Sequence, residues 1–336
     1  MSTVASVENR VGIVVIGRRN STQLEACLAS LRESAAPVAY VDAGSQDQNV
    51  ALALEHGAVV VELDAGQPYS EARARNEGFS ALLARHPSLW FVQFLDADCT
   101  LLPGWLDAAT AAFKIDAWRA VVTGAVQEQR PRDSVYNRLC SMEGRLPAGD
   151  LTGWGALGGS MMVRAAVFER LGGFNTQVIT GEVPEFGARV GLAHLKLTKI
   201  DAPMATHDAE IVRFRHWWLR TLRGGYAIGE RFHLDGASEL PACVHDHRCT
   251  MLWGVGLPML IWLTAIPTRG ASLLGLLAYG WLAIGAYRQR RRVGDSVADA
   301  MLFARYTVVG KIAGGVGLLR FYVHRLARRL RVIESK

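Results

Sequence analysis

Residues 90–98, WFVQFLDAD, join a short apolar run to a pair of acidic residues. The run at 90–95 is rich in aromatic and other apolar side chains, which predicts a buried β-strand. Asp96, Ala97 and Asp98 follow it without a break. Two carboxylates two residues apart at a strand end can approach one hard cation such as Mg²⁺ or Mn²⁺. Such triplets are common on loops, so the meaning of this one depends on the sequence around it.

The sequence before this stretch alternates short apolar runs with helical patterns. We expect strands at residues 11–16, 38–41 and 58–62, and helices from Ser21, at 47–56 and at 70–85. This βαβαβαβ alternation predicts an α/β fold with a mainly parallel sheet and helices on both faces. Ligands in such sheets bind at the carboxyl ends of the strands, where Asp42 and Asp96 both stand.

The loop that starts at Asp42 is the second acidic strand end. A carboxylate there can accept hydrogen bonds from a base or a ribose, and Gly44 and Ser45 permit a tight turn. Asp47 is explained at least as well as the N-cap of the next helix. Together, the two acidic strand ends favour a nucleotide and metal site over an isolated loop motif.

The second half of the chain is less regular. We expect strands at residues 120–127, 153–163 and 196–202, and a helix over about 210–230 that is rich in arginine and tryptophan. The arginines of this helix can hold a diphosphate or a lipid phosphate. The same composition is typical of an interfacial helix whose Trp and Arg side chains lie among lipid head groups. Both interpretations place the helix near a membrane.

Charge and hydropathy differ between the two ends of the chain. Half of the 336 residues are hydrophobic and a fifth are charged, which indicates a soluble domain joined to a short membrane part. Residues 251–336 hold 13 Lys and Arg against 3 Asp and Glu, whereas the whole chain has a net charge of +6. The preceding residues therefore have no basic surplus for nucleic acid. The tail's arginines alternate with apolar runs, which favours anionic lipid head groups as partners.

Two apolar segments of 17 residues, 251–267 and 271–287, predict a helical hairpin. A helix of this length spans about 25 Å, slightly less than a hydrocarbon core of roughly 30 Å. Arg248 precedes the first segment, and four arginines at residues 288–292 follow the second. By the positive-inside rule we expect a membrane-spanning hairpin with both ends in the cytoplasm. The alternative is a pair of buried or interfacial helices.

The cysteines and the N-terminus both favour a cytoplasmic catalytic domain. The five cysteines are odd in number and form no Cys-x-x-Cys pair, so we expect no disulfide framework. The first ten residues, MSTVASVENR, lack the apolar core of a signal peptide. We therefore expect the protein at the cytoplasmic membrane, with its catalytic domain in the cytoplasm.

Six segments of the chain carry a resemblance to a known family. They read VVIGRRN…LEACLASL, VDAGSQDQN, YSEARARNEG, FLDADCTLLPGW, GGSMMVRAAVFERLGGFN and GEVPEFGARV. In this order they resemble the family 2 glycosyltransferases of the GT-A fold, over about residues 11–230. The C-terminal part resembles that of bacterial members that build exopolysaccharides or lipid-linked glycans. The resemblance implies a GT-A domain at 1–235 and a juxtamembrane and membrane-associated helical region at 236–336.

The resemblance also implies a nucleotide and metal site. Asp42 would bind the uracil or ribose side of the nucleotide, with UDP as the favoured carrier. Asp96 would contact ribose or metal, and Asp98 would be the main ligand of an Mg²⁺ or Mn²⁺ cofactor. His207 would complete the metal shell as a neutral imidazole. Alternatively, His207 is a turn histidine stabilised by Asp208.

Two further segments are implied to face the donor. Arg75 and Asn76, in YSEARARNEG, would face the nucleotide and its diphosphate. Gly159, in GGSMMVRAAVFERLGGFN, would border the donor sugar and the acceptor. Both segments are therefore expected to lie beside the Asp-x-Asp triplet.

The catalytic base is the point at which this sequence departs from the family. Inverting members place a carboxylate in a Gly-Glu-Asp-type loop, where it deprotonates the acceptor hydroxyl as that oxygen attacks the anomeric carbon. The corresponding segment reads Gly181-Glu182-Val183-Pro184-Glu185, and the expected position of the base is Val183. Because valine cannot take a proton, we expect Glu182 as the base, with Glu185 as the alternative.

These expectations combine into one function and two alternatives. The main expectation is an inverting transferase that moves a sugar from a nucleoside-diphosphate sugar to a lipid-linked or growing glycan. The first alternative is a polyprenyl-phosphate glycosyltransferase. The second is a catalytically silent component of a polysaccharide assembly complex that binds nucleotide sugar, which is consistent with the valine at position 183.

Overall fold

The computed structural model divides the chain into two units. It describes residues 10–17, 21–42, 44, 47–143, 147–151, 158–178, 180–233 and 241–327. Unit 1 comprises residues 1–130, 140–178 and 182–210, and unit 2 comprises residues 131–139, 179–181 and 211–336. Unit 1 holds the β-sheet, and unit 2 holds the C-terminal helices.

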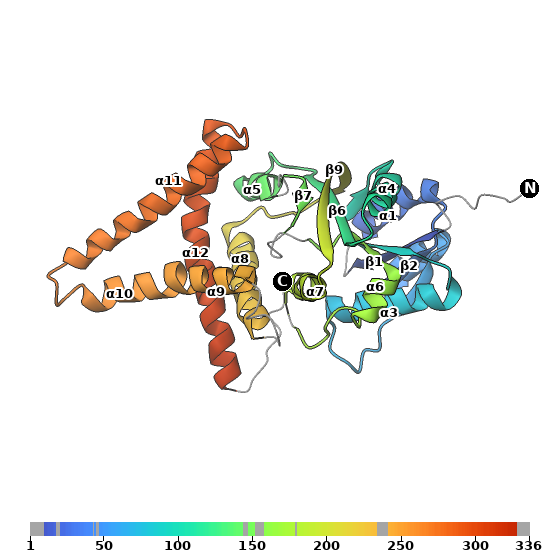
Figure 1. Ribbon diagram of the computed structural model, residues 1–336, viewed down its shortest axis with the longest axis horizontal. Coiled ribbons are helices and arrows are strands. Elements are labelled where there is room, and N and C mark those ends of the chain that lie inside the picture. The colour runs from blue at the N-terminus through green and yellow to red at the C-terminus, as the bar shows by residue number, and fades with distance from the viewer. Residues whose placement is uncertain are drawn as a thin grey trace, which may run out of the picture. The chain divides into compact units, whose positions relative to one another are not determined.

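Unit 1 is built on a sheet of nine described strands (Figure 1). They are β1 (Val11–Gly17), β2 (Val38–Asp42), β3 (Val59–Glu62), β4 (Phe91–Asp96), β5 (Cys99–Leu101), β6 (Arg119–Glu128), β7 (Gly149–Asp150), β8 (Met161–Arg164) and β9 (Lys196–His207). Their order is β3-β2-β1-β4-β8-β6-β9-β5, with β7 beside β9. The first four strands pair in parallel, as predicted, whereas β8 is antiparallel to both neighbours. The sheet is therefore parallel in its N-terminal part and mixed beyond it.

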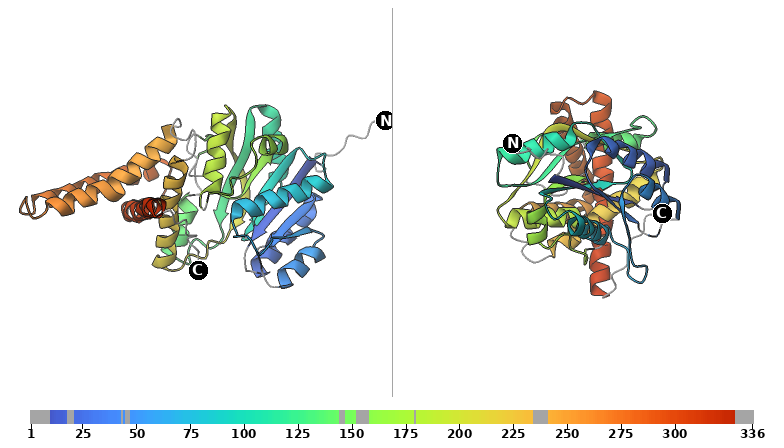
Figure 2. Two further views of the ribbon diagram at one scale, coloured as in Figure 1. Left: turned by 90° about the horizontal axis from the view of Figure 1, so that it is seen from below. Right: turned by 90° about the vertical axis from the view of Figure 1, so that its right-hand side faces the viewer.

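Helices cover both faces of this sheet, as predicted (Figure 2). Those of unit 1 are α1 (Ser21–Leu31), α2 (Asp47–Glu55), α3 (Glu71–Arg85), α4 (Trp105–Ile115), α6 (Ala165–Arg170) and α7 (Glu182–Leu192), with a 3₁₀ turn at Arg32–Ser34. On one face, Leu28 of α1 and Phe113 of α4 belong to a single hydrophobic cluster. On the other, Phe168 of α6 contacts Phe79 of α3 and Phe94 of β4. Burial on two faces explains why the strands read as continuous apolar runs.

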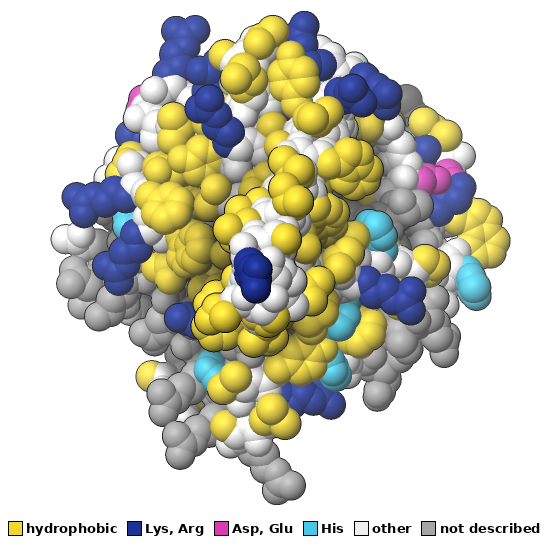
Figure 3. All heavy atoms as spheres, turned by 90° about the vertical axis from the view of Figure 1, so that its left-hand side faces the viewer, with side chains coloured by type: hydrophobic (Ala, Val, Ile, Leu, Met, Phe, Trp, Pro, Cys, Tyr) yellow, Lys and Arg dark blue, Asp and Glu magenta, His cyan; other side chains and the backbone are white. Residues whose placement is uncertain are grey.

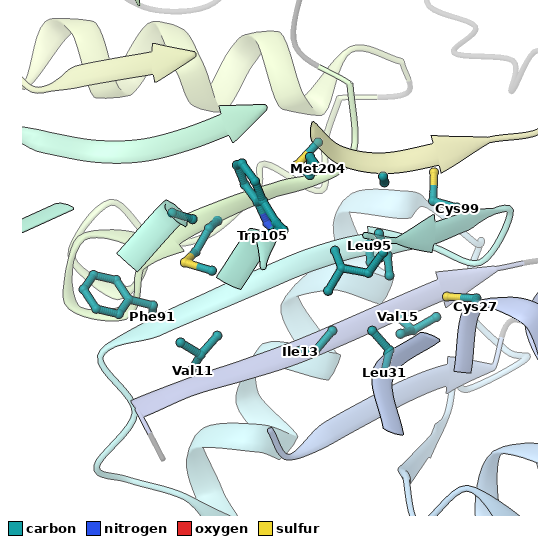
Figure 4. Close-up of a cluster of buried hydrophobic side chains, with 14 of the residues drawn as sticks. Val11, Ile13, Val15, Cys27, Leu31, Phe91, Leu95, Cys99, Trp105 and Met204 are labelled. Atoms are coloured by element: carbon teal, nitrogen blue, oxygen red, sulfur yellow. The ribbon is translucent and has the colours of Figure 1, made fainter. Parts of the chain in front are cut away.

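One residue of the apolar run that predicted β4 is polar, and it lies beside the hydrophobic cluster that contains Leu28 and Phe113. Gln93 is fully buried, and its side-chain oxygen accepts a hydrogen bond of 2.7 Å from the indole N–H of Trp105. Figure 4 shows Trp105 in this cluster near Leu95 and Met204. Because a buried amide is tolerated when it is hydrogen-bonded, Gln93 does not interrupt the strand. The strand places Asp96 at its carboxyl end.

Unit 2 is helical in the residues that the structure describes. Its elements are the first turn of α5 (Val135–Glu143), α8 (Phe214–Phe232), α9 (Pro241–Met251), a π-helical turn at Leu252–Gly256, α10 (Leu257–Thr264), a 3₁₀-helix at Ala271–Leu276, α11 (Leu277–Arg292) and α12 (Val297–Leu326). Helix α8 packs so closely on α12 that a Cβ at Gly225 would clash with the Gly314 carbonyl group. This packing groups residues 211–233 with the C-terminal helices, whereas the predicted boundary lay after residue 235.

The two apolar segments form a helical hairpin with its turn at residues 265–270. Large apolar side chains on both arms are mostly exposed; they include Leu260, Trp262, Leu263, Ile266, Leu274, Leu277 and Trp281, with exposed fractions from 58% to 90%. Figure 3 shows hydrophobic side chains gathered on the face of the molecule that carries this hairpin. A patch of this kind usually marks an interaction surface.

By length and composition, one helix in the described part of the chain, α12, could cross a membrane. A third of its most apolar stretch is buried inside the protein. Because the core helix of a soluble protein can have the same length and composition, α12 is weak evidence for a membrane. That the hairpin at 251–287 spans a bilayer stays a prediction.

Candidate active site

The two aspartates of the Asp-x-Asp triplet flank a tight backbone contact at the end of β4. The Ala97 amide donates a hydrogen bond of 2.7 Å to the Ile16 carbonyl oxygen of β1. A Cβ at Gly17 would clash with the Ala97 methyl group, so this approach needs a glycine and a small side chain. Asp96 and Asp98 have side-chain exposures of 33% and 40%. Both carboxylates can therefore reach a ligand in solvent.

Arg75 of α3 is the centre of an ion-pair cluster beside the triplet. Its side chain is 1% exposed, and its guanidinium lies 2.7 Å from Asp96 Oδ1 and 2.6 Å from Glu182 Oε1. The carboxylate of Glu71 lies 3.4 Å from the same group. Burial, with Glu182 nearby, raises the pKa of Glu71 to about 7, so Glu71 is partly protonated at neutral pH. The cluster joins β4, α3 and α7 at one point, since a buried guanidinium is stable only when such partners surround it.

Gly159 lies directly against this cluster. A Cβ at Gly159 would clash with Arg75 Nη2 and with the Asp96 carboxylate, whereas a Cβ at Gly158 would meet nothing within 4 Å. The neighbouring Ser160 is buried, and its hydroxyl lies 3.5 Å from the Asp96 amide nitrogen. The absence of a side chain at Gly159 is therefore what lets Arg75 and Asp96 pair.

His207 lies between two carboxylates because β9 pairs with β5, with Cys99 opposite His207. Its Nε2 lies 3.4 Å from Asp98 Oδ2, and its Nδ1 lies 3.6 Å from Glu128 Oε2. Burial lowers the pKa of His207, but hydrogen bonds with Asp98 and Glu128 outweigh burial and raise this pKa to about 10. Burial raises the pKa of Asp98, but the bond with His207 lowers it overall. Without a cation, His207 is thus an imidazolium, which must lose a proton before it can bind metal.

The acidic pair of the triplet is the candidate cation site. Within the described ranges, no three His, Cys, Asp or Glu side chains form a preassembled metal-binding group. Asp96 is engaged by Arg75, so Asp98 is the carboxylate of the triplet that is better placed to bind a cation. An oxygen ligand suits Mg²⁺ or Mn²⁺, and diphosphate oxygens and waters can complete the shell. Metal binding by Asp96, Asp98 and His207 stays a prediction.

Asp42 and Asn76, both predicted to face the nucleotide, are engaged in local hydrogen bonds. Asp42 is buried at the end of β2, and its two oxygens accept from the Tyr40 hydroxyl at 3.2 Å and the Gly44 amide at 3.0 Å. The Asn76 carboxamide exchanges two hydrogen bonds of 2.8 Å with the backbone of Phe174. Asn76 thus fastens the segment after α6 to α3. Contacts of either residue with a nucleotide stay predictions.

Helix α7 begins at Glu182 and carries both candidate bases. Glu182 is 9% exposed and pairs with Arg75. Glu185 is 4% exposed, and each of its oxygens lies 2.7 Å from the guanidinium of Arg189, which also donates to backbone carbonyl groups. Val183 is equally buried. The structure therefore brings Glu182 into the cluster with Asp96, and it engages Glu185 in fastening α7.

Three polar residues of this region were not singled out from the sequence: Glu71, Glu128 and Arg189. Glu128 ends β6, and a carboxylate at a strand end is the signal that pointed to Asp42 and Asp96. Glu71 and Arg189 each lie four residues from their partner on a helix. That spacing is too common on helix surfaces to mark a site.

Comparison with known proteins identifies the class to which this fold and site belong. Residues 11–172 match the family model described as glycosyl transferase family 2. Residues 11–172 are therefore a glycosyltransferase domain of family 2, and the sheet has the GT-A fold. None of the curated proteins shows a significant sequence match.

Solved structures with the same fold cover nearly the whole chain. A mannosyltransferase, PcManGT from Pyrobaculum calidifontis, in complex with GDP-Man and Mn²⁺, is 19% identical with a TM-score of 0.55, over 96% of this chain and 88% of that one. S. aureus TarS 1–349 is 14% identical with a TM-score of 0.51, over 95% and 93% of the two chains. At these identities the likeness shows the fold alone.

Proposed function

We propose that the protein transfers a sugar from a nucleoside-diphosphate sugar to a lipid-linked or growing glycan at the cytoplasmic face of a membrane. Membership of family 2 supports a nucleotide-sugar donor. A structure of the same fold holds GDP-Man with Mn²⁺, which supports a divalent cation. The nucleotide stays open between UDP, which the sequence resemblance favours, and GDP, which that structure holds.

The cluster of Asp96, Arg75 and Glu182 carries this proposal. One buried guanidinium lies within 2.7 Å of a carboxylate at the end of β4 and of another at the start of α7. Sugar transfer needs the donor diphosphate and the attacking oxygen to be held close together. Asp96, on the predicted donor side, and Glu182, the candidate base, both pair with the guanidinium of Arg75. This shared partner meets the requirement.

In the proposed reaction, Asp98 binds the cation and Glu182 takes the proton of the acceptor. The cation, when bound, neutralises the charge of the departing diphosphate. Asp98 suits this role because its side chain is partly exposed and its pKa is lowered by His207, against the effect of burial. Glu182 accepts the hydroxyl proton as the acceptor oxygen attacks the anomeric carbon, and Arg75 orients the Glu182 carboxylate.

The substitution Asp98→Ala tests the donor half of this proposal. We expect nucleotide sugars to raise the Tm of the wild-type protein in Mn²⁺, and EDTA to reverse the effect. We expect Asp98→Ala to lose the Mn²⁺-dependent increase, because it removes the carboxylate that is best placed to bind the cation. Asp107→Ala, at an exposed position of α4, is the matched control and should keep the increase. Full activity of Asp98→Ala would show that the proposed mechanism is wrong.

The hairpin of unit 2 supports an acceptor that is carried by a membrane. Its arms expose Trp262 and Trp281, and the sequence from 247 to 294 contains no acidic residue. Arg248 and Arg288, at the two ends of the hairpin, are exposed. Apolar arms with basic ends suit a bilayer with anionic head groups, because the arms avoid water and the arginines pair with phosphates.

Val183 favours a second candidate function, transfer to a polyprenyl phosphate. The expected position of the base is a buried valine, and Glu182 is already paired with Arg75. A phosphate monoester, with a second pKa of about 6, is anionic at neutral pH, so its oxygen can attack without a general base. Product analysis with membrane extract separates the two functions. An acid-labile sugar phosphate supports the second candidate, and an acid-stable glycoside supports the first.

A further inference from the structure

Glu230, on α8 of unit 2, is a buried carboxylate outside the cluster around Arg75. The residue is 8% exposed. Its Oε2 atom accepts a hydrogen bond of 2.9 Å from the Thr180 backbone amide and one of 3.2 Å from the Thr180 hydroxyl. A buried carboxylate is costly unless hydrogen bonds satisfy it. The two bonds therefore stabilise the Glu230 carboxylate, and they also hold Thr180 against α8.

The segment held by Glu230 leads directly into the candidate base. Thr180 precedes Glu182 by two residues, and Gly181 between them has a φ of +83°, which favours glycine. A Cβ at Gly181 would lie 2.8 Å from the Ala227 methyl group. Because Ala227 and Glu230 are three residues apart, they share one face of α8. That face receives Thr180 and Gly181 immediately before α7 begins.

Helix α8 is itself fixed by backbone contacts with α12. A Cβ at Gly225 would clash with the Gly314 carbonyl group, and a Cβ at Gly317 would clash with the Leu222 carbonyl group. Small residues that bring two helix backbones this close leave little room for one helix to slide along the other. Glu230 therefore stands on a rigid support.

We propose that Glu230 is a positioning residue for sugar transfer, which sets the main-chain position from which Glu182 acts. This inference rests on the proposed role of Glu182 as the base. Arg75 holds the end of the Glu182 side chain, whereas Glu230 holds the main chain two residues earlier. Without the Glu230 contacts, the chain can pivot at Gly181. A displacement of about 1 Å can lower the rate of a reaction by about 10²-fold.

Two substitutions of Glu230 test this role. Glu230→Ala removes both hydrogen bonds, whereas Glu230→Gln keeps an oxygen that can accept them. We expect Glu230→Ala to lower kcat by about 10- to 100-fold, with the Kd of the nucleotide sugar in Mn²⁺ changed by less than about twofold. Glu230→Gln should recover most of the kcat. The control is Gly224→Ala, an exposed position of α8 at which a Cβ meets nothing within 4 Å. It should keep the wild-type kcat.

Hydrogen exchange at the Thr180 amide gives a readout that does not depend on turnover. We expect faster exchange in Glu230→Ala than in the wild-type protein, with Glu230→Gln in between. Faster exchange with an unchanged kcat would overturn the positioning role. So would a loss of donor affinity as large as the loss of kcat. An unchanged exchange rate would show that Glu230 does not hold the Thr180 amide.

A further variant covers the case in which Glu230→Ala does not fold. Thr180→Val removes only the hydroxyl bond to Glu230, and it should lower kcat by a smaller factor with the donor Kd unchanged. An unchanged kcat in this variant would overturn the positioning role. If the wild-type protein binds the donor but transfers no sugar, the proposed function fails and the positioning role fails with it. Failure of the positioning role alone instead leaves wild-type transfer intact.

Discussion

Gly159 is a residue of the site that has no room for a side chain. A Cβ there would clash with Arg75 and Asp96, whereas a Cβ at the adjacent Gly158 would meet nothing within 4 Å. We expect Gly159→Ala to lower kcat/KM by about tenfold or more, equivalent to roughly 1.4 kcal/mol, because Arg75 and Asp96 must move apart. Gly158→Ala is the matched control and should change kcat/KM little. Steady-state kinetics of both variants, with Tm as a check on folding, distinguish the two; wild-type activity of Gly159→Ala would show that this pairing is dispensable.

The residues of the site differ in how readily they could be predicted from the sequence. Asp96 and Asp98 could be predicted, because two acidic residues directly after an apolar run form a local pattern. The ion pair of Arg75 with Glu182 could not, since the two residues are 107 positions apart. Their contact follows from how α3 and α7 pack on the sheet, and no local pattern records that packing.

The strands show the same division between local and long-range causes. β1, β2 and β4 were predicted to within a residue or two, because their apolar runs are buried on both faces. β5, with three residues, was missed because its hydrogen-bonded partner is β9. β9 was predicted at 196–202 but continues to His207, where it pairs with both β5 and β6. Strand formation at such positions depends on neighbours that the sequence does not reveal.

Helix α12 lies within the predicted helical region at 236–336, but its bounds were not predicted. Arg305, Lys311 and Arg320 interrupt its apolar pattern, so no membrane segment or amphipathic helix stood out. In the structure, its glycines pack against the backbone of α8 and of the π-helical turn at Leu252–Gly256. These contacts need only small residues, and small residues give no periodic signal.

The apolar arms of the hairpin can be tested without any assay of catalysis. We expect the wild-type protein to co-sediment with vesicles that contain anionic lipid. The double substitution Leu263→Arg and Leu277→Arg should weaken this binding, because each arginine costs about 2.5–3.5 kcal/mol in the hydrocarbon core. Ile115→Arg, at an exposed apolar position of α4 in unit 1, is the matched control and should bind as the wild type does. Equal binding by the double variant would show that the hairpin does not enter the bilayer.

The chain as a whole joins a glycosyltransferase unit to a helical unit with an exposed apolar hairpin. The family resemblance implied a boundary after residue 235. The structure assigns residues 211–233 to unit 2, because the packing of α8 on α12 is not visible in composition. Residues 179–181 also belong to unit 2, so the chain returns to unit 1 at Glu182. The candidate base thus directly follows one of the places where the chain passes between the two units.

Sugar transfer by Glu182→Gln, measured together with donor binding, tests whether this carboxylate is the base. Glutamine can still accept a hydrogen bond from Arg75, but it cannot take the acceptor proton. We expect the Kd of the nucleotide sugar in Mn²⁺ to stay near the wild-type value and the rate of transfer to fall by about 10²–10⁴-fold. Transfer at the wild-type rate would contradict the proposed mechanism and remove Glu182 from the role of base.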